Sequence, residues 1–182
     1  LPEEAEGLAR FEQGERLAAA PALHRRFEEL AAEAGERPAL ITDDGVESYA
    51  EVDGRANGLA RALLDAGVGR EEVVGVYTGR SAALPWVVLG IWKAGGCYLP
   101  LLTDLPEERV RMVAREAGVR VVVALDGAVP AVGERVLRPE AIASSAEPVR
   151  PGGAEMGGRQ LAAILYTSGS TGVPKGVMLH HE

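Results

Sequence analysis

The chain has few of the residues that mark several classes of protein. Its 182 residues include a single cysteine, Cys97, so no internal disulfide can form and a reducing cytoplasm is the compartment we expect. Aromatic residues make up only 4% of the chain, so the core must rest on Ala, Val and Leu. No apolar run approaches the roughly 20 residues that span a bilayer. The acidic N-terminus also lacks the pattern of a secretory signal.

Basic residues are in the minority as well. Lys and Arg number 19 against 27 Asp and Glu, which gives a formal net charge of −8. Without a basic stripe there is little to release counterions from a phosphate backbone, so nucleic acid is excluded as the main partner. A local loop can still bind phosphate against the global charge. The composition otherwise suits one globular domain, with neither nucleic acid nor membrane as its partner.

Hydrophobic periodicity predicts alternating helices and strands. In the first helix, Leu23, Phe27 and Leu30 recur at helical spacing, whereas the strands are short β-branched or apolar runs. Helices are expected at 22–34, between Ser48 and Gly67, at 82–93 and at 106–117, and strands at 73–77, 97–101, 119–124, 132–137 and 161–167, with another starting at 177–180. This alternation predicts an α/β fold with a mostly parallel β-sheet and flanking helices.

Local signals mark the ends of these elements. An Asp-Gly turn at 43–45 between two β-prone runs predicts a hairpin. Ser48 and Glu51 have the spacing of a capping box at the start of the second helix. Asp104 is expected to cap the helix at 106–117. Residues 139–160 are rich in Pro and Gly, which predicts a linker or surface loop and not a core element.

The strand at 161–167 leads into the segment with the clearest chemical character. Residues 165–176 read Leu-Tyr-Thr-Ser-Gly-Ser-Thr-Gly-Val-Pro-Lys-Gly. Glycines allow consecutive backbone N–H groups to turn toward one concavity, and such a nest binds anions. Hydroxyl groups add donors and the lysine adds a full charge. The predicted phosphate-binding residues are Thr167, Ser168, Gly169, Ser170, Thr171, Gly172 and Lys175.

Two other interpretations of this loop compete with a phosphate-binding nest. A generic Ser/Thr/Gly loop is most often only a polar surface turn. A Walker A loop would need glycine at Pro174 and a Ser or Thr at Gly176, so its helix-opening glycine and its magnesium hydroxyl are both missing. The chain also leaves no room for the helix that follows a Walker A loop. A Walker A site is therefore disfavoured.

The whole string from 166 to 176 resembles the phosphate-loop motif of the adenylate-forming superfamily, which includes peptide-synthetase adenylation domains, acyl- and aryl-CoA ligases and luciferases. Residues 48–57 resemble the opening motif of that superfamily. Residues 93–101 resemble its second motif, in the form typical of nonribosomal peptide synthetases. Leu102-Thr103 departs from the Asp-Pro that usually follows. The resemblance runs from about residue 23 to residue 181.

The resemblance implies that residues 1–21 form a lead-in segment and that 22–182 form the incomplete N-terminal part of an AMP-forming adenylation domain. Such an enzyme uses ATP and Mg²⁺ to convert an acid, here an amino acid, into an acyl-AMP. A carrier protein with a phosphopantetheine arm then accepts the acyl group. The alternatives are a non-catalytic fragment or docking module, or a fragment of an acyl- or aryl-CoA ligase. The chain alone is not expected to complete the reaction.

The sequence also gives expectations about partners and about the remaining candidate residues. A sheet that ends at its last strand would leave an open edge, so self-association or a partner chain is expected. The small helper protein found with many peptide-synthetase adenylation domains is a further partner that the resemblance allows. No residue is predicted to be a catalytic acid or base, and no set of metal ligands is evident. His180 and His181 point to opposite sides of a strand and cannot serve one site. Cys97 is expected to be an inert core residue.

Overall fold

The structure is a computed structural model of the chain, and it describes residues 21–43, 45–150, 159–167 and 175–181. Its central feature is a six-stranded sheet with strand order β6-β5-β3-β4-β7-β8. Every neighbouring pair in this sheet is parallel except β7 and β8. The predicted α/β class with a mostly parallel sheet is therefore confirmed.

Helices and strands alternate along most of the described chain. The elements are α2 (Leu23–Ala34), β1 (Pro38–Thr42), β2 (Gly45–Ser48), α3 (Tyr49–Asp65), β3 (Val73–Thr78), α4 (Leu84–Lys93), β4 (Cys97–Leu102), α5 (Glu107–Glu116), β5 (Val121–Ala124), β6 (Arg135–Leu137), the 3-10 turn η1 (Pro139–Ala141), β7 (Leu161–Thr167) and β8 (Lys175–His180). The hairpin of β1 and β2 is antiparallel, as the turn at 43–45 predicted. Among the described residues, no helix is both long and apolar enough to cross a membrane.

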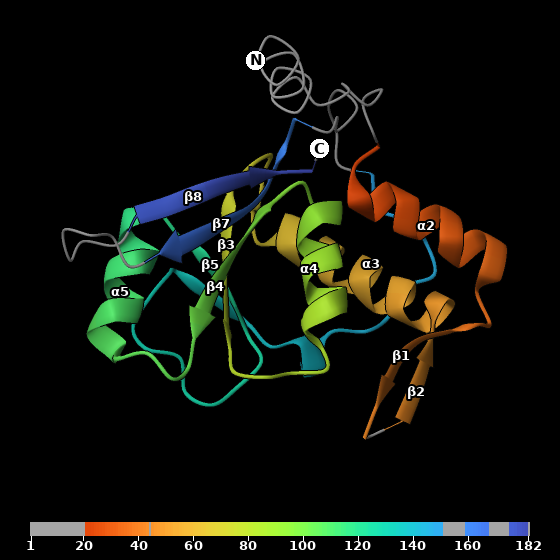
Figure 1. The fold of residues 1–182 in the computed structure, drawn as a ribbon, viewed down its shortest axis with the longest axis horizontal. Helices are drawn as coiled ribbons and strands as arrows, with labels where there is room; N and C mark the ends of the chain where they lie inside the picture. Colours follow the sequence, from red (N-terminus) through yellow and green to blue (C-terminus); the bar gives the residue numbers. More distant parts are fainter. Residues whose placement is uncertain (1–20, 44, 151–158, 168–174, 182) are drawn as a thin grey trace, which may run out of the picture.

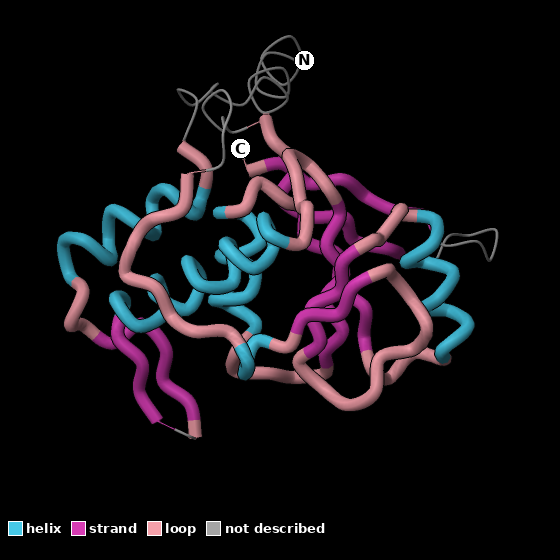
Figure 2. Tube along the Cα trace, turned by 180° about the vertical axis from the view of Figure 1, so that it is seen from behind, coloured by secondary structure: helices cyan, strands magenta, loops and turns pink. Residues whose placement is uncertain are grey.

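The helices cover both faces of the sheet (Figure 1, and from behind in Figure 2). One face carries α4 with α3 and α2 beyond it, and α5 lies on the other. Successive strand residues serve the two sides in turn, as the pleat requires. In β5, Val121 and Val123 join the core beneath α3 and α4, whereas Val122 joins the core beneath α5. The sheet is therefore buried on both faces, which explains the continuous apolar runs of its strands.

The capping signals are only partly confirmed. The Ser48 hydroxyl accepts the Glu51 N–H at 3.3 Å and the Glu51 carboxylate accepts the Ser48 N–H at 2.7 Å, which completes the predicted capping box. Gly67 has φ of 88° just beyond α3, as a helix-ending glycine should. The prediction for Asp104 is wrong, because α5 begins after Pro106 without a side-chain cap. Proline at that position fixes the backbone angle instead.

The prediction that residues 139–160 form only a surface loop is wrong for its first part. This segment runs across α3, where the Ser145 N–H donates to the Gly54 carbonyl at 2.9 Å. Arg61 binds the Glu147 carbonyl at 2.9 Å, and Val149 is buried in the core. The extended chain satisfies its polar groups on the helix and so needs no regular structure of its own. Residues 151–158 lie outside the described part of the chain.

Gly58 is the point of closest approach between α3 and this segment. A Cβ at Gly58 would lie 2.1 Å from the carbonyl oxygen of Ala143, which is backbone and cannot rotate away. We expect Gly58→Ala to lower the free energy of unfolding by about 1–3 kcal/mol through overpacking. Chemical denaturation would measure it.

The matched control for that change is Gly54→Ala, one helical turn earlier on the same helix. A Cβ there meets nothing closer than 3.7 Å. Because alanine favours helix over glycine by about 1 kcal/mol, this control should be neutral or stabilising. Equal losses in the two variants would contradict the close approach at Gly58.

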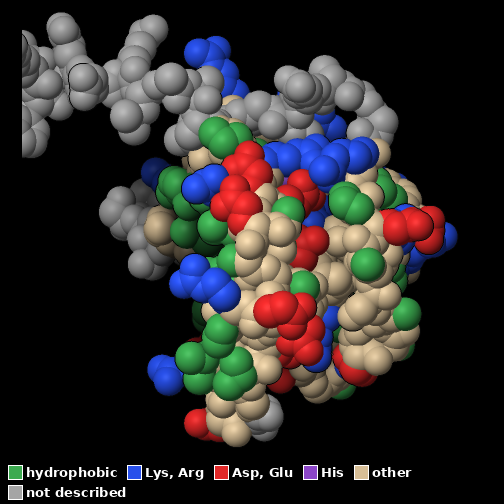
Figure 3. Space-filling view, turned by 90° about the vertical axis from the view of Figure 1, so that its right-hand side faces the viewer, with side chains coloured by type: hydrophobic (Ala, Val, Ile, Leu, Met, Phe, Trp, Pro, Cys, Tyr) green, Lys and Arg blue, Asp and Glu red, His purple; other side chains and the backbone are tan. Residues whose placement is uncertain are grey.

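The buried face of α2 agrees with the prediction at Phe27, which packs against the core, and departs from it at Leu23. Leu23 is 53% exposed, whereas His24 is fully buried. The side of the helix that faces α3 and α4 also carries Glu28, which reaches a buried lysine, Lys93. The helix is thus held by polar contacts that a hydrophobic period does not reveal. On the face of the molecule seen in Figure 3, acidic and basic side chains of the described residues are intermixed.

Lys93 is the most unusual residue of the interior, since its side chain has no exposed surface. Its Nζ lies 2.7 Å from Asp53 Oδ1, 2.7 Å from Asn57 Oδ1 and 3.1 Å from Glu28 Oε1. Asn57 also donates to the second oxygen of Asp53 at 2.9 Å. All three donors of the ammonium group therefore have an acceptor, and the group links α4 to α3 and α2.

Candidate phosphate-binding site

Strands β7 and β8 form a hairpin that carries the predicted phosphate loop between them. Their last paired residues are Thr167 and Lys175, which lie opposite each other where the loop begins and ends. The Thr167 hydroxyl donates to the Lys175 carbonyl at 3.5 Å. The structure therefore brings together the first and last predicted site residues. The predicted residues Ser168, Gly169, Ser170, Thr171 and Gly172 lie outside the described residues.

The start of β7 is anchored by several side chains. The Trp92 indole N–H donates to the Ala162 carbonyl at 2.8 Å, and Glu71 accepts the Leu161 N–H at 3.2 Å. Just before the strand, the buried Gln160 amide donates to the Gly95 carbonyl at 2.7 Å. Because β7 runs parallel to β4, its far end lies at the carboxyl edge of the sheet. The loop therefore leaves a strand whose position is fixed, at the edge where parallel sheets place their ligand sites.

Gly176, the last residue of the motif, lies against the ring of Tyr166, so a side chain at this position would crowd the ring. The two residues are paired across the hairpin. A Cβ at Gly176 would come within 3.3 Å of the Tyr166 ring and within 3.1 Å of Ile164 Cγ2. Tyr166 in turn packs against the core beneath α5. Sequence reasoning used Gly176 only to reject a Walker A loop and missed this contact, which no spacing rule would reveal.

The described ends of the loop suit anion binding and not proton transfer. The Thr167 and Lys175 side chains are exposed, so a hydroxyl and an ammonium group are open to a ligand. No ion pair joins Lys175 to any residue that the structure describes. A hydroxyl and a lysine in open solvent bind and position phosphate oxygens, but neither is a general base near neutral pH.

The cysteine does not supply a nucleophile. Cys97 is buried in β4, and burial, with a further contribution from Glu71, raises the pKa of its thiol to about 11. It is therefore a thiol near neutral pH and not the thiolate that attacks. Within the described ranges there is also no group of three or more His, Cys, Asp or Glu side chains that could hold a metal ion.

The two histidines that follow the loop in sequence lie far from it. Because β8 runs antiparallel to β7, His180 pairs with Leu161, and the seven-residue strand separates it from the loop by about 20 Å. His180 is exposed and His181 is buried, as the alternation predicted. The His181 ring lies against Trp92 and His24, with ring centroids 5.0 and 5.6 Å apart. His181 therefore packs in the interior, whereas His180 lies at the surface.

The buried histidines remain neutral near neutral pH. Burial, followed by the nearby Arg25, lowers the pKa of His24 from 6.5 to about 3. Burial likewise lowers the pKa of His181, with a further contribution from His180. Both rings therefore serve as packing residues between α2, α4 and the chain after β8.

Comparison with known proteins agrees with the motif. A family model described as AMP-binding enzyme matches residues 27–182. Tyrocidine synthase 3 of Brevibacillus parabrevis is 39% identical over 158 residues, which cover 86% of this chain and 2% of that protein. Bacitracin synthase 1 of Bacillus licheniformis is 34% identical over 173 residues, which cover 88% of this chain and 3% of that protein. The chain therefore spans only a small part of the length of these relatives.

Solved structures show the same fold. The N-terminal subdomain of NpsA from Klebsiella oxytoca superposes with a TM-score of 0.78 at 27% identity, over 90% of this chain and 43% of that one. The nonribosomal peptide synthetase FmoA3 gives a TM-score of 0.80 at 28% identity, over 92% of this chain and 18% of that one. Family model, relatives and fold agree, and the chain belongs to the family of AMP-binding enzymes.

Proposed function

We propose that this chain contributes the phosphate-binding hairpin of an adenylation domain that activates an amino acid for nonribosomal peptide synthesis. The observation that carries the proposal is the hairpin of β7 and β8. It holds Thr167 opposite Lys175 at the carboxyl edge of the sheet, around a motif that the AMP-binding family model covers. In this proposal residues 1–21 are a lead-in segment and residues 22–182 are the N-terminal part of the domain.

The reaction divides into two steps. A carboxylate oxygen of the acid attacks the α-phosphorus of ATP, so that a new O–P bond forms while the bond to the β-phosphate breaks and pyrophosphate leaves. A phosphopantetheine thiol on a carrier protein then attacks the acyl carbonyl. A thioester forms, and AMP leaves with the oxygen that joined it to the acyl group. A protein contributes mainly position and charge to such a phosphate displacement.

The chain's own residues act at the leaving group. Thr167, Ser168, Ser170 and Thr171 donate hydroxyl groups to phosphate oxygens, whereas Gly169 and Gly172 allow the backbone to approach. Lys175 neutralises charge that accumulates on the departing pyrophosphate. Mg²⁺ accompanies nucleotide phosphates in most such sites. The described residues gather no carboxylates for it, so no metal ligand is assigned to this chain.

The class of acid rests on relatives. FmoA3 has been solved with α-methyl-L-serine-AMP, an aminoacyl adenylate. The NpsA subdomain has been solved with 3-hydroxybenzoyl-AMSN, which carries an aryl acyl group. Because the relatives in sequence include synthases of tyrocidine and bacitracin, an amino acid is the proposed substrate. An aryl acid is the second candidate. The NpsA-ThdA fusion of an adenylation domain with a PCP supports transfer to a carrier protein.

Acid-dependent exchange of pyrophosphate into ATP tests the proposal. The assay uses the continuous polypeptide that contains this chain and the remaining length of the adenylation domain, with a panel of amino acids and hydroxybenzoic acids. One amino acid, or a small set of similar ones, should stimulate exchange strongly above the no-acid background. Stimulation by an aryl acid alone would select the second candidate, and no stimulation by any carboxylic acid would refute adenylation.

A further inference from the structure

Three buried side chains share a feature that folded proteins rarely show. His24, Gln160 and His181 hold every buried side-chain nitrogen or oxygen that has no hydrogen-bond partner among the described residues. In both histidines neither ring nitrogen has a partner. The three residues belong to one place, because His24 lies against His181 and the His181 N–H donates to the Gln160 carbonyl at 3.2 Å. Since buried polar groups are nearly always paired, this cluster is an exception that needs an explanation.

The two imidazole rings meet where α2, α4 and the end of β8 come together. Their centroids are 5.6 Å apart and their planes are inclined by 70°. On its other side His181 lies edge-on to the indole of Trp92, at 5.0 Å. His24 has no exposed surface and His181 is only 8% exposed. A proton taken up by His24 in this arrangement would therefore place a positive charge out of reach of water, at a high cost in free energy.

The charges around the rings do not offset that cost. The charged or titratable groups that act on the two rings are Arg25 and Glu28 of α2, Lys93 of α4 and His180 of β8. Glu28 is the only carboxylate among them, and it already pairs with Arg25 at 3.0 Å and with Lys93 and Arg150 at 3.1 Å. An imidazolium ion would therefore meet two cations and a carboxylate whose charge is already balanced.

The attachment of α2 to the rest of the fold depends on His24. It is the only residue of the helix that is buried. Phe27 is partly buried against the core, with its ring 5.4 Å from that of Tyr49, and Glu28 adds its ion pair with Lys93. A helix held by one buried side chain and a few polar contacts is the kind of element that opens locally, before the rest of a protein unfolds.

We propose that His24 and His181 form an acid-sensitive contact, through which mild acid releases α2 from α4 and β8 while the sheet stays folded. Only the neutral rings fit the closed contact, since a protonated ring would lie beside Arg25 and Lys93 without an acceptor. Release of the helix exposes the rings to water, where they take up protons. The contact does not depend on the phosphate hairpin, so it stands whether or not the chain takes part in adenylation.

The direction of the pH effect follows from the protons bound in the two states. Burial holds the pKa of His24 at about 3 in the closed state, whereas release returns it to its ordinary value of 6.5. The contact is therefore at full strength above pH 6.5 and weakens as the pH falls from 6.5 toward 3. Within this range, each histidine that binds its proton only after release increases the released population about tenfold per pH unit.

Hydrogen exchange measured by mass spectrometry on the 182-residue chain tests the proposal. Amides of α2 are compared with amides of α5, which lies on the other face of the sheet, and the rates are corrected for the pH dependence of exchange in an unfolded chain. Between about pH 7 and about pH 5, protection of α2 should fall by at least about tenfold per pH unit once His24 begins to titrate. Protection of α5 should stay constant over the same range.

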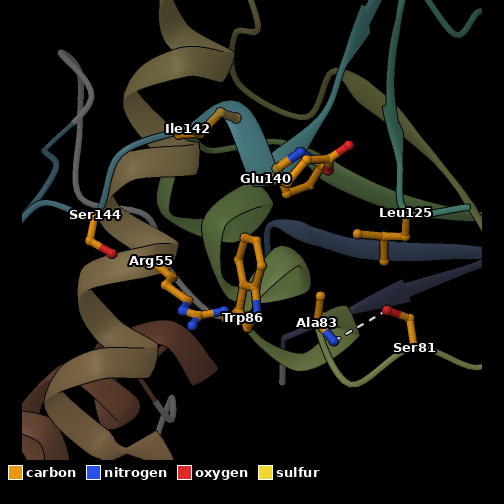
Figure 4. A pocket seen from close by; sticks show the side chains of 9 residues that line it. Arg55, Ser81, Ala83, Trp86, Leu125, Glu140, Ile142 and Ser144 are labelled. Carbon is orange, nitrogen blue, oxygen red and sulfur yellow. Dashed lines mark hydrogen bonds between the residues drawn. The ribbon is translucent and has the colours of Figure 1, made fainter. Parts of the chain in front are cut away.

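Trp92 provides a second measurement, because its indole touches His181. The other tryptophan of the chain, Trp86, lies at the opposite end of α4 and lines a separate cavity of about 440 Å³ together with Arg55 and Ser81 (Figure 4). Trp86→Phe therefore leaves an indole only at the contact. The emission of Trp92 should change over the pH range in which α2 loses its protection.

His24→Leu removes the proton-binding ring of α2 and keeps an apolar side chain in its place. It should make the fall in α2 protection less steep by about tenfold per pH unit. His180→Gln removes an exposed histidine of β8 and is the control, which should keep the steepness of the parent. If His24→Leu does not fold, His24→Gln takes its place, since glutamine is also neutral throughout this range. Constant protection of α2, equal losses in α2 and α5, or an unchanged pH dependence in the His24 variant would each overturn the proposal.

Discussion

Replacing Lys93 by methionine is expected to lower the free energy of unfolding by about 3–5 kcal/mol, the usual loss when one partner of a buried ion pair is removed. Methionine keeps most of the volume of the side chain, so the effect reports the charge and not a cavity. It leaves the carboxylates of Asp53 and Glu28 facing each other without their shared cation, and it removes a donor to Asn57. The measurement is urea denaturation, in which the m-value should be the same as that of the parent.

The matched control is an exposed ion pair on the same side of the molecule. Arg26 and Glu29 pair at 2.7 Å on α2, but both side chains are more than half exposed. Arg26→Met should therefore cost less than about 1 kcal/mol. Converting Asp53 to Asn in the Lys93→Met background should recover part of the loss, because the carboxylate left without a cation goes with it. Glu28 keeps Arg25 and Arg150 as ion-pair partners at 3.0 and 3.1 Å. A loss for Lys93→Met no larger than that for Arg26→Met would contradict this account.

The pH dependence gives a second signature of the same cluster. Desolvation alone would raise the pKa of Glu28, but Lys93 and Arg25 together hold that pKa below its ordinary value. A lowered folded pKa contributes stability above the unfolded pKa, which is lost as the pH falls through the folded pKa. Without Lys93 the pKa of Glu28 should rise. The free energy of unfolding of Lys93→Met should therefore fall less between neutral and acidic pH than that of the parent.

The contacts of Lys93 also show which features could not be predicted from the sequence. The capping box at Ser48 and the hairpin at 43–45 were predictable, because their partners are close along the chain: three residues apart in the capping box and three to ten in the hairpin. The contacts of Lys93 with Asp53 and Glu28 join residues 40 and 65 positions apart, so no local pattern contains them. A helical period likewise assigned Leu23 to the buried side. His24 and Glu28 occupy it instead, because His24 lies against the ring of His181 and Glu28 pairs with Lys93 of α4.

The candidate site likewise has features that the local sequence predicts and features that depend on long-range contacts. The string at 166–176 revealed the phosphate loop, and the strand before it could be read from its apolar run. The register that sets Thr167 opposite Lys175, and the contact of the Tyr166 ring with Gly176, depend on how two strands pair.

Lys175→Ala in the adenylation polypeptide is expected to lower acid-dependent pyrophosphate exchange by about 100-fold, the scale on which removal of one preorganised charge-stabilising group acts. The loss should fall mainly on kcat, with a smaller rise in the KM for ATP. Lysine at this position meets charge that increases as pyrophosphate departs, so its interaction is stronger in the transition state than with bound ATP. The KM of the acid should stay unchanged.

The stability of the Lys175→Ala variant distinguishes a role of Lys175 in catalysis from a role in folding. Lys175 is exposed at the first position of β8, and its carbonyl, not its side chain, accepts the Thr167 hydroxyl. Lys175→Ala should therefore unfold at the same denaturant concentration as the parent, whereas Lys175→Arg, which keeps the charge, should retain much of the exchange activity. The exposed Arg26→Ala is the control for a lost surface cation. If Lys175→Ala exchanged pyrophosphate as fast as the parent, the phosphates would have to be held by other groups, and the role given to the hairpin of β7 and β8 would be wrong.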